Sequence, residues 1–405
     1  MSSIADRGVL ETGGGVKVRP ARKRKKKKRR ARSGDFVLTA LVMILVIFGI
    51  IMVFSASYYT ALSKQGTPYY YLKRELIFAA SGWLLFLLLA VIDYHKILKF
   101  ALPIYIFATA MVWLTYSPLG ASYNNAARWI QIGSFTIIPG EFAKLAVIIF
   151  SAWWLTKKPE RITQPVRGIL PLLAIVAVCV AGVYFQPSTT TAMTILLILI
   201  GVLFVAGIKF RYILLMAAAG AGVLVFHIMQ DSGSGYRSSR ISSFLDPFAD
   251  EQGTGYQVVQ GLYALASGGL KGVGLGNSIQ KNLYLPDPQN DFILAIIGEE
   301  LGYIGLLVLL AVYLLLIWRC IHIALRAPDP QGMLTASGIT IMLALQVILN
   351  VMVVTSLMPP TGIALPFISY GGTAMWLFMM AMGMMINISR QKKPEPDQDE
   401  TGEES

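Results

Sequence analysis

Long, continuous apolar stretches recur about ten times along this 405-residue chain. Each is roughly 18 to 22 residues long, which as an α-helix crosses about 30 Å of hydrocarbon. The stretches do not alternate between apolar and polar residues, which excludes a membrane β-barrel. We therefore predict an all-α polytopic membrane protein with about ten transmembrane helices. The predicted spans are residues 36–56, 76–92, 100–119, 138–156, 168–185, 191–208, 212–229, 292–318, 333–357 and 373–389.

The positive charge of the chain is concentrated before the first span. Residues 1–35 hold 13 Lys and Arg against three acids, mostly within Arg22–Arg32. The positive-inside rule then places the N-terminus, and after ten crossings the C-terminus, in the cytoplasm. The run suits anionic lipid headgroups, whereas no interleaved aromatic residues support a nucleic-acid partner. We predict a disordered basic tail at 1–35, a membrane domain at 36–390 and a disordered acidic tail at 391–405.

Four segments face outward in this orientation, and they contain the residues that are unusual in a membrane protein. They are residues 120–141, 186–191, 230–291 and 358–372. Ionisable side chains at membrane depth are costly unless they are paired or wet, so they mark candidate functional sites. The spans are interrupted by Arg128, Glu141, Lys144, Asp291, Glu299 and Glu300. Because most of these lie towards the outside, we expect the chemistry to face outward.

The segment 230–291 is an extracellular loop that is too long for a simple connector. Arg237, Arg240 and Lys271 give it positive charge. Apolar spacing predicts a short helix from Tyr256 to Leu270. The glycines at 268–276 follow no strand, so they indicate a turn that another backbone approaches closely rather than a nucleotide loop.

Asp291 ends this loop directly before an apolar helix. An aspartate at or near this position is a favoured helix N-cap, which does not preclude a catalytic role as an acid or base. Glu299 lies about 12 Å further along the helix, too far to share a proton with Asp291. Glu299 and Glu300 are expected to pair with basic groups on neighbouring spans.

The segment 120–141 carries Arg128 and Trp129, and its end carries Glu141 and Lys144. Trp129 is also typical of an interfacial aromatic belt. Glu141 and Lys144 are three residues apart, so they either neutralise each other or, with the helix that Pro139 begins, help to bind an anion. A cavity with Arg128 and Lys144 would suit a phosphate-bearing ligand.

The segment 358–372 is rich in proline and glycine, which predicts non-helical backbone that is buried in protein and shapes a cavity. No spacing of Cys, His, Asp or Glu predicts a metal site. A divalent cation, Mg²⁺ or Mn²⁺, is left open as an aid to catalysis.

Taken together, these motifs resemble the SEDS family of shape, elongation, division and sporulation proteins, represented by FtsW, RodA and SpoVE. The resemblance covers about Phe36 to Arg390. The motifs are Ala127-Arg128-Trp129-Ile130, Pro139-Gly140-Glu141-Phe142-Ala143-Lys144, Gly255-Tyr256-Gln257, Asn290-Asp291-Phe292-Ile293, Gly298-Glu299-Glu300-Leu301-Gly302 and Leu365-Pro366-Phe367-Ile368-Ser369-Tyr370-Gly371-Gly372. Residues 54–59 and 361–363 favour the division and sporulation branch.

The resemblance implies a ten-span peptidoglycan glycosyltransferase that polymerises lipid II outside the bacterial cytoplasmic membrane. Its partners would be a class B penicillin-binding protein and other divisome or elongasome proteins. It implies that Asp291 is catalytic and that Arg128, Trp129, Glu141 and Lys144 line the adjoining cavity. We add Arg237, Arg240 and Lys271 as candidate cations for the leaving pyrophosphate.

Two departures from the family pattern stand out. Ser188, Thr189 and Thr190 follow Gln186-Pro187 where the family usually has an acidic residue and a glycine, and Ile138-Pro139-Gly140-Glu141 replaces the usual Gln-Pro-Ser-Glu. A lipid II flippase or a non-catalytic division scaffold are the alternative functions. A transporter needs a polar route through both leaflets, whereas here the ionisable groups gather outside, which favours the enzyme.

Overall fold

The computed structural model describes residues 34–118, 120–123, 126–133, 135–158, 160, 164–186, 188–230, 243–250, 253 and 255–391. Met1–Ala31 form one unit of the chain, and all the described residues belong to the second unit, Arg32–Ser405. The predicted tails at 1–35 and 391–405 therefore lie almost wholly outside the described residues.

Helices dominate the described residues, and every predicted span coincides with one of them. The helices are α1 (Phe36–Gln65), α2 (Tyr70–Val91), α3 (Tyr94–Lys99), α4 (Ala101–Leu114), α5 (Pro139–Lys157), the π-helical turn η1 (Pro165–Ile169), α7 (Leu170–Phe185), α8 (Thr189–Val205), α9 (Phe210–Gln230), α11 (Tyr256–Gly268), α12 (Ile293–Leu325), α13 (Pro330–Val354) and α14 (Gly372–Arg390). The predicted helix at Tyr256–Leu270 is confirmed as α11.

Six helical stretches among the described residues are long and apolar enough to cross a membrane. They are α1, α2, α7 with the end of η1, α12, α13 and α14. The apolar helices α4, α8 and the first half of α9 are shorter, and α5 carries Glu141 and Lys144 in its first two turns. The all-α polytopic fold is confirmed, whereas the number of ten crossings stays a prediction.

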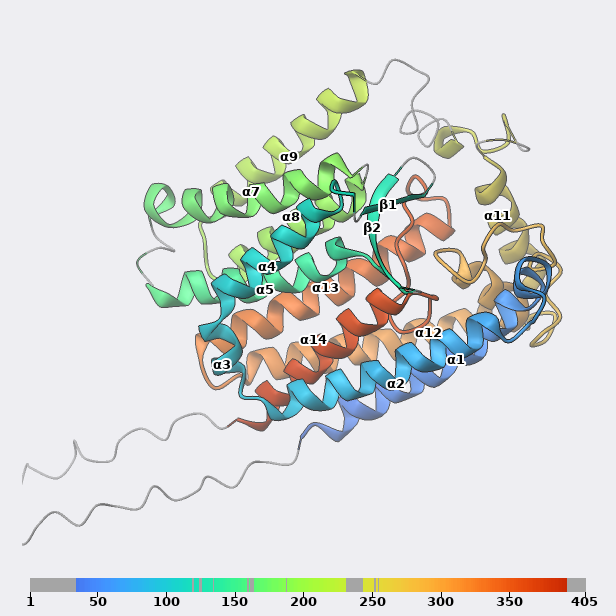
Figure 1. Cartoon of the computed structure of the whole chain (residues 1–405), viewed down its shortest axis with the longest axis horizontal. Coiled ribbons are helices and arrows are strands. Elements are labelled where there is room, and N and C mark those ends of the chain that lie inside the picture. Colours follow the sequence, from blue (N-terminus) through green and yellow to red (C-terminus); the bar gives the residue numbers. More distant parts are fainter. Residues whose placement is uncertain are drawn as a thin grey trace, which may run out of the picture. The chain divides into compact units, whose positions relative to one another are not determined.

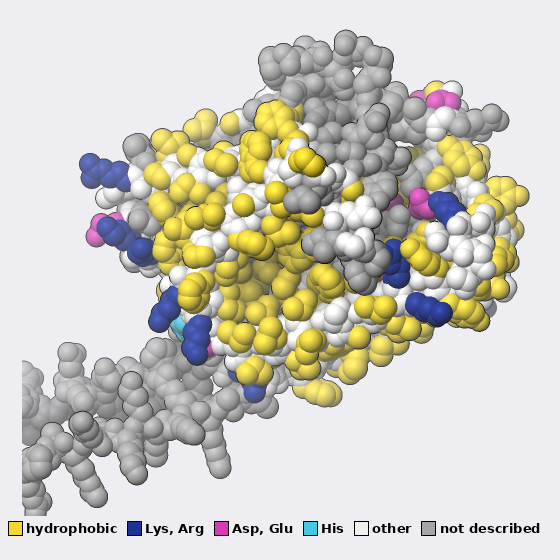
Figure 2. Space-filling view, in the orientation of Figure 1, with side chains coloured by type: hydrophobic (Ala, Val, Ile, Leu, Met, Phe, Trp, Pro, Cys, Tyr) yellow, Lys and Arg dark blue, Asp and Glu magenta, His cyan; other side chains and the backbone are white. Residues whose placement is uncertain are grey.

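The helices α1, α2, α12, α13 and α14 lie side by side (Figure 1). In its most apolar window α14 is 78% buried, against 22% for α12, so α14 forms the core while α12 turns most of its surface outward. Figure 2 shows hydrophobic side chains covering the visible flank, with the visible Lys, Arg, Asp and Glu gathered towards its two ends. This distribution is the one expected of a protein that sits in a bilayer.

The segment between α13 and α14 is non-helical and packs inside the protein, as predicted. Leu365, Phe367 and Ile368 in this segment are buried. A Cβ atom on Gly49 of α1 would lie 2.3 Å from the Phe367 carbonyl oxygen, so only glycine lets α1 approach so closely. We call residues 358–371 the re-entrant segment.

The glycine-rich turn after α11 packs its backbone directly on α12. The Val273 and Gly274 amides donate to the carbonyl oxygens of Glu299 and Glu300, at 3.0 Å each. Gly272 has φ +78, and a Cβ atom there would lie 2.2 Å from the Glu300 oxygen. The predicted close approach of another backbone is confirmed.

Candidate active site

Hydrogen bonds connect the four predicted outward segments at one end of the helices. The Tyr370 amide donates to the Gln289 carbonyl oxygen (2.9 Å) and the Ile138 amide to Thr373 Oγ1 (3.2 Å). Arg128 Nε donates to the Gln186 carbonyl oxygen (3.2 Å). Segments far apart in the sequence therefore meet around the loop that carries Asp291.

Asp291 lies half-buried just outside α12. The N-cap of α12 is Phe292, and no side chain accepts a capping hydrogen bond there. Asp291 therefore lies one residue outside the N-cap position of α12. A Cβ atom built on Gly362 would lie 3.7 Å from Asp291 Oδ2, so the carboxylate faces the re-entrant segment.

Asn350 of α13 fixes the backbone of Asp291 to the re-entrant segment. Its Nδ2 donates to the Asp291 carbonyl oxygen (2.8 Å) and to the Ile363 carbonyl oxygen (2.7 Å). The side chain is fully buried, where an unpaired polar group would be costly. Because one amide holds both segments, it fixes the position of Asp291 relative to Gly362.

Gln346 lies one turn before Asn350 and extends the same network towards α5. Its Nε2 donates to the Ala364 carbonyl oxygen (3.3 Å), and its Oε1 accepts from Lys144 Nζ (3.0 Å). Sequence reasoning missed both amides. The available signal was two amide side chains four residues apart, on one face of an otherwise apolar span.

Glu141 and Lys144 form a buried ion pair. Lys144 Nζ lies 2.8 Å from Oε1 and 2.7 Å from Oε2 of Glu141, and the Lys144 side chain is only 2% exposed. The interpretation as a mutually neutralised pair is confirmed. With Gln346 as a further acceptor, the pair holds α5 against α13 beside the re-entrant segment.

Arg128 lies in a small antiparallel sheet that the sequence analysis did not predict. The strands are β1 (Gly120–Tyr123), β2 (Ala126–Ile132) and β3 (Phe135–Ile137), in that order. Ala121 pairs with Trp129 and Ser122 with Ala127, so the register passes over Arg128. Such a bulge redirects a side chain and is frequent beside active sites; here it accompanies the contact with Gln186.

Gln186 anchors the connection that Arg128 touches. It is buried, and its Nε2 donates to Thr115 Oγ1 (2.7 Å) and to the Val112 carbonyl oxygen (2.8 Å). Ser188, at one of the family departures, donates from Oγ to Thr191 Oγ1 (2.9 Å). The altered segment is thus ordered by hydroxyl contacts at the start of α8.

Lys271, the one remaining predicted cation among the described residues, is not beside Asp291. Lys271 is exposed on the glycine-rich turn, which packs on α12 about 10 Å beyond its first residue. Arg237 and Arg240 lie outside the described residues.

Glu299 and Glu300 are fully buried and serve the loop rather than the reaction. Glu300 pairs with Lys281 Nζ (2.7 Å) and accepts from Ser55 Oγ (2.7 Å), while Glu299 accepts from Ser278 Oγ and the Ile279 amide. The predicted basic partner exists for Glu300, but it belongs to the loop and not to a neighbouring span. Both acids hold the loop upstream of Asp291.

Two further ionisable side chains, those of Tyr370 and Glu75, lie beside the site. Burial raises the pKa of the Tyr370 hydroxyl to about 12, so this phenol stays protonated at neutral pH. Glu75 of α2, which the sequence analysis did not single out, is fully buried near the Gly371 amide. Neither of its carboxylate oxygens makes a hydrogen bond to a described residue.

A family model described as "Cell cycle protein", which covers FtsW, RodA and SpoVE, matches residues 35–394. The chain belongs to this family. Stage V sporulation protein E of Bacillus subtilis (strain 168) is 39% identical over 362 residues, covering 89% of this chain and 98% of that protein. The probable peptidoglycan glycosyltransferase FtsW of Geobacter sp. (strain M18) is 37% identical over 363 residues, covering 89% and 97%.

Solved structures share the fold described above. One, described as "Structural coordination of polymerization and crosslinking by a peptidoglycan synthase complex", matches with a TM-score of 0.72 at 26% identity, covering 88% of this chain and 98% of that chain. The rod shape determining protein RodA of Thermus thermophilus matches with a TM-score of 0.64 at 24% identity, covering 90% and 99%. The resemblance inferred from the motifs is confirmed.

Proposed function

We propose that this protein is a peptidoglycan glycosyltransferase that polymerises lipid II on the outer face of the bacterial cytoplasmic membrane. The similarity to FtsW and SpoVE proteins over 89% of the chain supports this activity and favours a role in division or sporulation. The positive-inside rule, which puts the cluster around Asp291 outside, supports the outer face as the place of reaction.

In the proposed reaction, Asp291 is the general base. It takes the proton from the 4-hydroxyl of the acceptor sugar as that oxygen bonds to the anomeric carbon of the donor. The bond from this carbon to the pyrophosphate oxygen breaks, and the pyrophosphate leaves on its polyprenyl chain. One displacement inverts the anomeric centre, so an α-linked donor gives a β-linked glycan.

The leaving pyrophosphate needs positive charge, because negative charge grows on it in the transition state. We assign this role first to Arg128, which the strand bulge directs towards the Gln186 connection. Arg237, Arg240 and Lys271 are proposed as further cations for the pyrophosphate, and Trp129 is proposed to line the substrate cavity. Glu141 and Lys144 are proposed to position the site through Gln346, since their charges already neutralise each other.

The observation that carries the proposal is the attachment of Asp291 to the re-entrant segment. Asn350 bonds to the backbone oxygens of Asp291 and Ile363 at once. A general base must be held within hydrogen-bond reach of the proton that it removes, and a half-buried carboxylate on a backbone held by Asn350 supports this role.

Replacement of the base tests the assignment. Asp291→Asn removes the proton acceptor but keeps the shape of the side chain, so we expect glycan polymerisation from purified lipid II to be abolished in a folded protein. Asp287→Asn is the matched control, because Asp287 lies four residues away in the same loop and forms an exposed ion pair with Lys64 at 2.8 Å. Polymerisation that survives in Asp291→Asn would remove Asp291 as the base.

The same assay separates the alternative functions. We propose a class B penicillin-binding protein as the partner, in line with the synthase complex among the structural matches. Glycan synthesis by the purified protein, alone or with such a transpeptidase, supports an enzyme. Transport of lipid II across vesicles without any glycan product would instead identify a flippase.

A further inference from the structure

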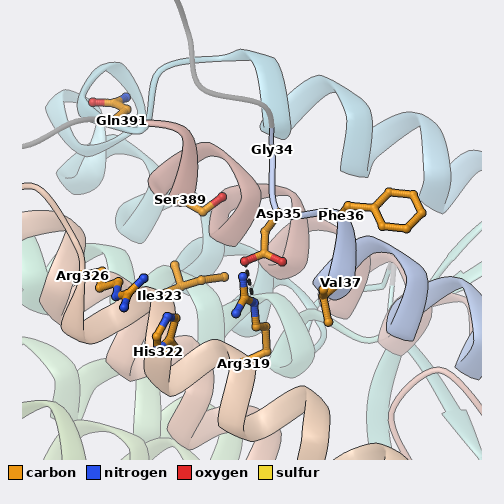
Figure 3. Close-up of a pocket in the computed structure, with 10 residues that line it drawn as sticks. All are labelled: Gly34, Asp35, Phe36, Val37, Arg319, His322, Ile323, Arg326, Ser389 and Gln391. Atoms are coloured by element: carbon orange, nitrogen blue, oxygen red, sulfur yellow. Dashed lines mark hydrogen bonds and ion pairs between the residues drawn. The ribbon is translucent and has the colours of Figure 1, made fainter.

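A cavity of about 360 Å³ opens at the end of the helices opposite to Asp291. It lies between the start of α1, the last turns of α12 and the end of α14 (Figure 3). Its lining residues are Gly34, Asp35, Phe36, Val37, Arg319, His322, Ile323, Arg326, Ser389 and Gln391. None of them takes part in the site described above, and the positive-inside rule places them at the cytoplasmic surface.

The cavity has more positive than negative charge. Asp35 Oδ2 pairs with Arg319 Nε at 2.7 Å, and Asp35 Oδ1 accepts from the Leu38 amide at 3.0 Å. This acid is therefore neutralised within its own helix start. The Arg326 guanidinium is exposed and makes no ion pair or hydrogen bond with any described side chain or backbone group.

His322 lies one turn before Arg326, on the same face of α12. Its ring stacks on Trp318 with centroids 5.8 Å apart, and its nitrogens have no hydrogen-bond partner among the described residues. Arg326 and His322 thus lie on one side of the Asp35–Arg319 pair, as Figure 3 shows. Together they offer donors to an anion.

The other side of the cavity is apolar and exposed. There Phe36 is 80% exposed and Val37 48%. In a bilayer these side chains face acyl chains. A soluble anion would use only the cationic side, whereas a phospholipid uses both, with its headgroup in the cavity and its chains along Phe36.

We propose that this cavity binds the phosphate headgroup of an anionic phospholipid in the inner leaflet. The volume is at the low end of the range for ligand sites and suits a headgroup without its chains. Basic pockets between transmembrane helices at the cytoplasmic side are suited to such headgroups. Arg326 provides the charge-assisted hydrogen bond, and His322 a second donor.

The proposal is tested on the purified full-length protein by native mass spectrometry in detergent, with phosphatidylglycerol, phosphatidylcholine or glycerol 3-phosphate added. The wild type is expected to retain phosphatidylglycerol in preference to the other two. Arg326→Ala with His322→Ala is expected to weaken this retention about tenfold, the loss of one or two charge-assisted bonds. Lys99→Ala, which removes an exposed cation at the same end but outside the cavity, is the matched control.

Because the basic N-terminal tail is intact in every variant, general attraction to anionic lipid is the same in all of them. Equal loss in Lys99→Ala and in the double variant overturns the proposal, as does equal retention of phosphatidylcholine. Binding of glycerol 3-phosphate as strong as that of the lipid overturns it in favour of a soluble phosphate ester. If the double variant proves poorly folded, Arg326→Lys is the variant to measure. It keeps the positive charge and is expected to retain phosphatidylglycerol as the wild type does.

Discussion

At the scale of single residues, two buried amides of α13 hold the re-entrant segment at the candidate site. Asn350 and Gln346 each join a backbone oxygen of the re-entrant segment to a group on another element. A hydrogen bond contributes only about 1 kcal/mol net, but an orphaned buried partner costs more. The geometry around Asp291 therefore depends on α13, which carries no proposed catalytic group.

Removing the Asn350 amide tests whether this side chain positions Asp291 in addition to stabilising the fold. Asn350→Ala loses two hydrogen bonds, about 2 kcal/mol, and leaves the Asp291 backbone without its tie. We expect kcat for lipid II polymerisation to fall tenfold or more, with a smaller change in KM, because the base is misplaced rather than the substrate excluded.

Asn387 provides the matched control at the opposite end of the helices. It is buried, accepts from the Tyr94 amide (3.0 Å) and donates to the Ala90 carbonyl oxygen (3.0 Å). Asn387→Ala also loses two hydrogen bonds, so it is expected to lower the unfolding temperature about as much as Asn350→Ala does. Its kcat is expected to stay within about twofold of the wild type. An unchanged kcat in Asn350→Ala would contradict the positioning role.

At the scale of elements, the re-entrant segment is placed by its close contact with α1. The contact is backbone against glycine, since a Cβ atom on Gly49 would lie 2.3 Å from the Phe367 oxygen and 2.8 Å from the Ile368 Cα. Neither neighbour is a flexible side chain, so the whole segment would have to shift. The same segment presents Ile363 and Ala364 to α13.

Gly49→Ala is therefore expected to lower both stability and activity. Overpacking of this kind costs about 1–3 kcal/mol, measured as a lower unfolding temperature in detergent, and lipid II polymerisation should fall with it. Gly220→Ala is the control, because a Cβ atom there meets nothing within 4 Å and alanine favours a helix by up to about 1 kcal/mol. If both variants behave alike, the contact between α1 and the segment is not what places the site.

At the scale of the whole molecule, the helices could be predicted well from the sequence. Each predicted span is a continuous apolar run that is long enough by itself to indicate a helix in a membrane. The strands β1 to β3 were missed because they are short and follow directly after an apolar helix. The pair of Glu141 and Lys144 could be predicted from spacing along one helix. The roles of Asn350 and Gln346 could not, because they depend on residues 13 to 202 positions away.

Orientation in the membrane is the property of the whole molecule on which both proposals depend, and it can be measured directly. Lys271 lies on the glycine-rich turn, at the same end of the helices as Asp291, and Lys99 lies on α3 at the opposite end; both side chains are exposed. In intact cells, a membrane-impermeant maleimide is expected to label Lys271→Cys, and to label Lys99→Cys only after permeabilisation, because positive charge stays inside. The wild type is the control, since Cys179 and Cys320 are 1% and 0% exposed. Labelling of Lys99→Cys in intact cells would show the opposite orientation. It would contradict both the reaction at the outer face and the lipid site in the inner leaflet.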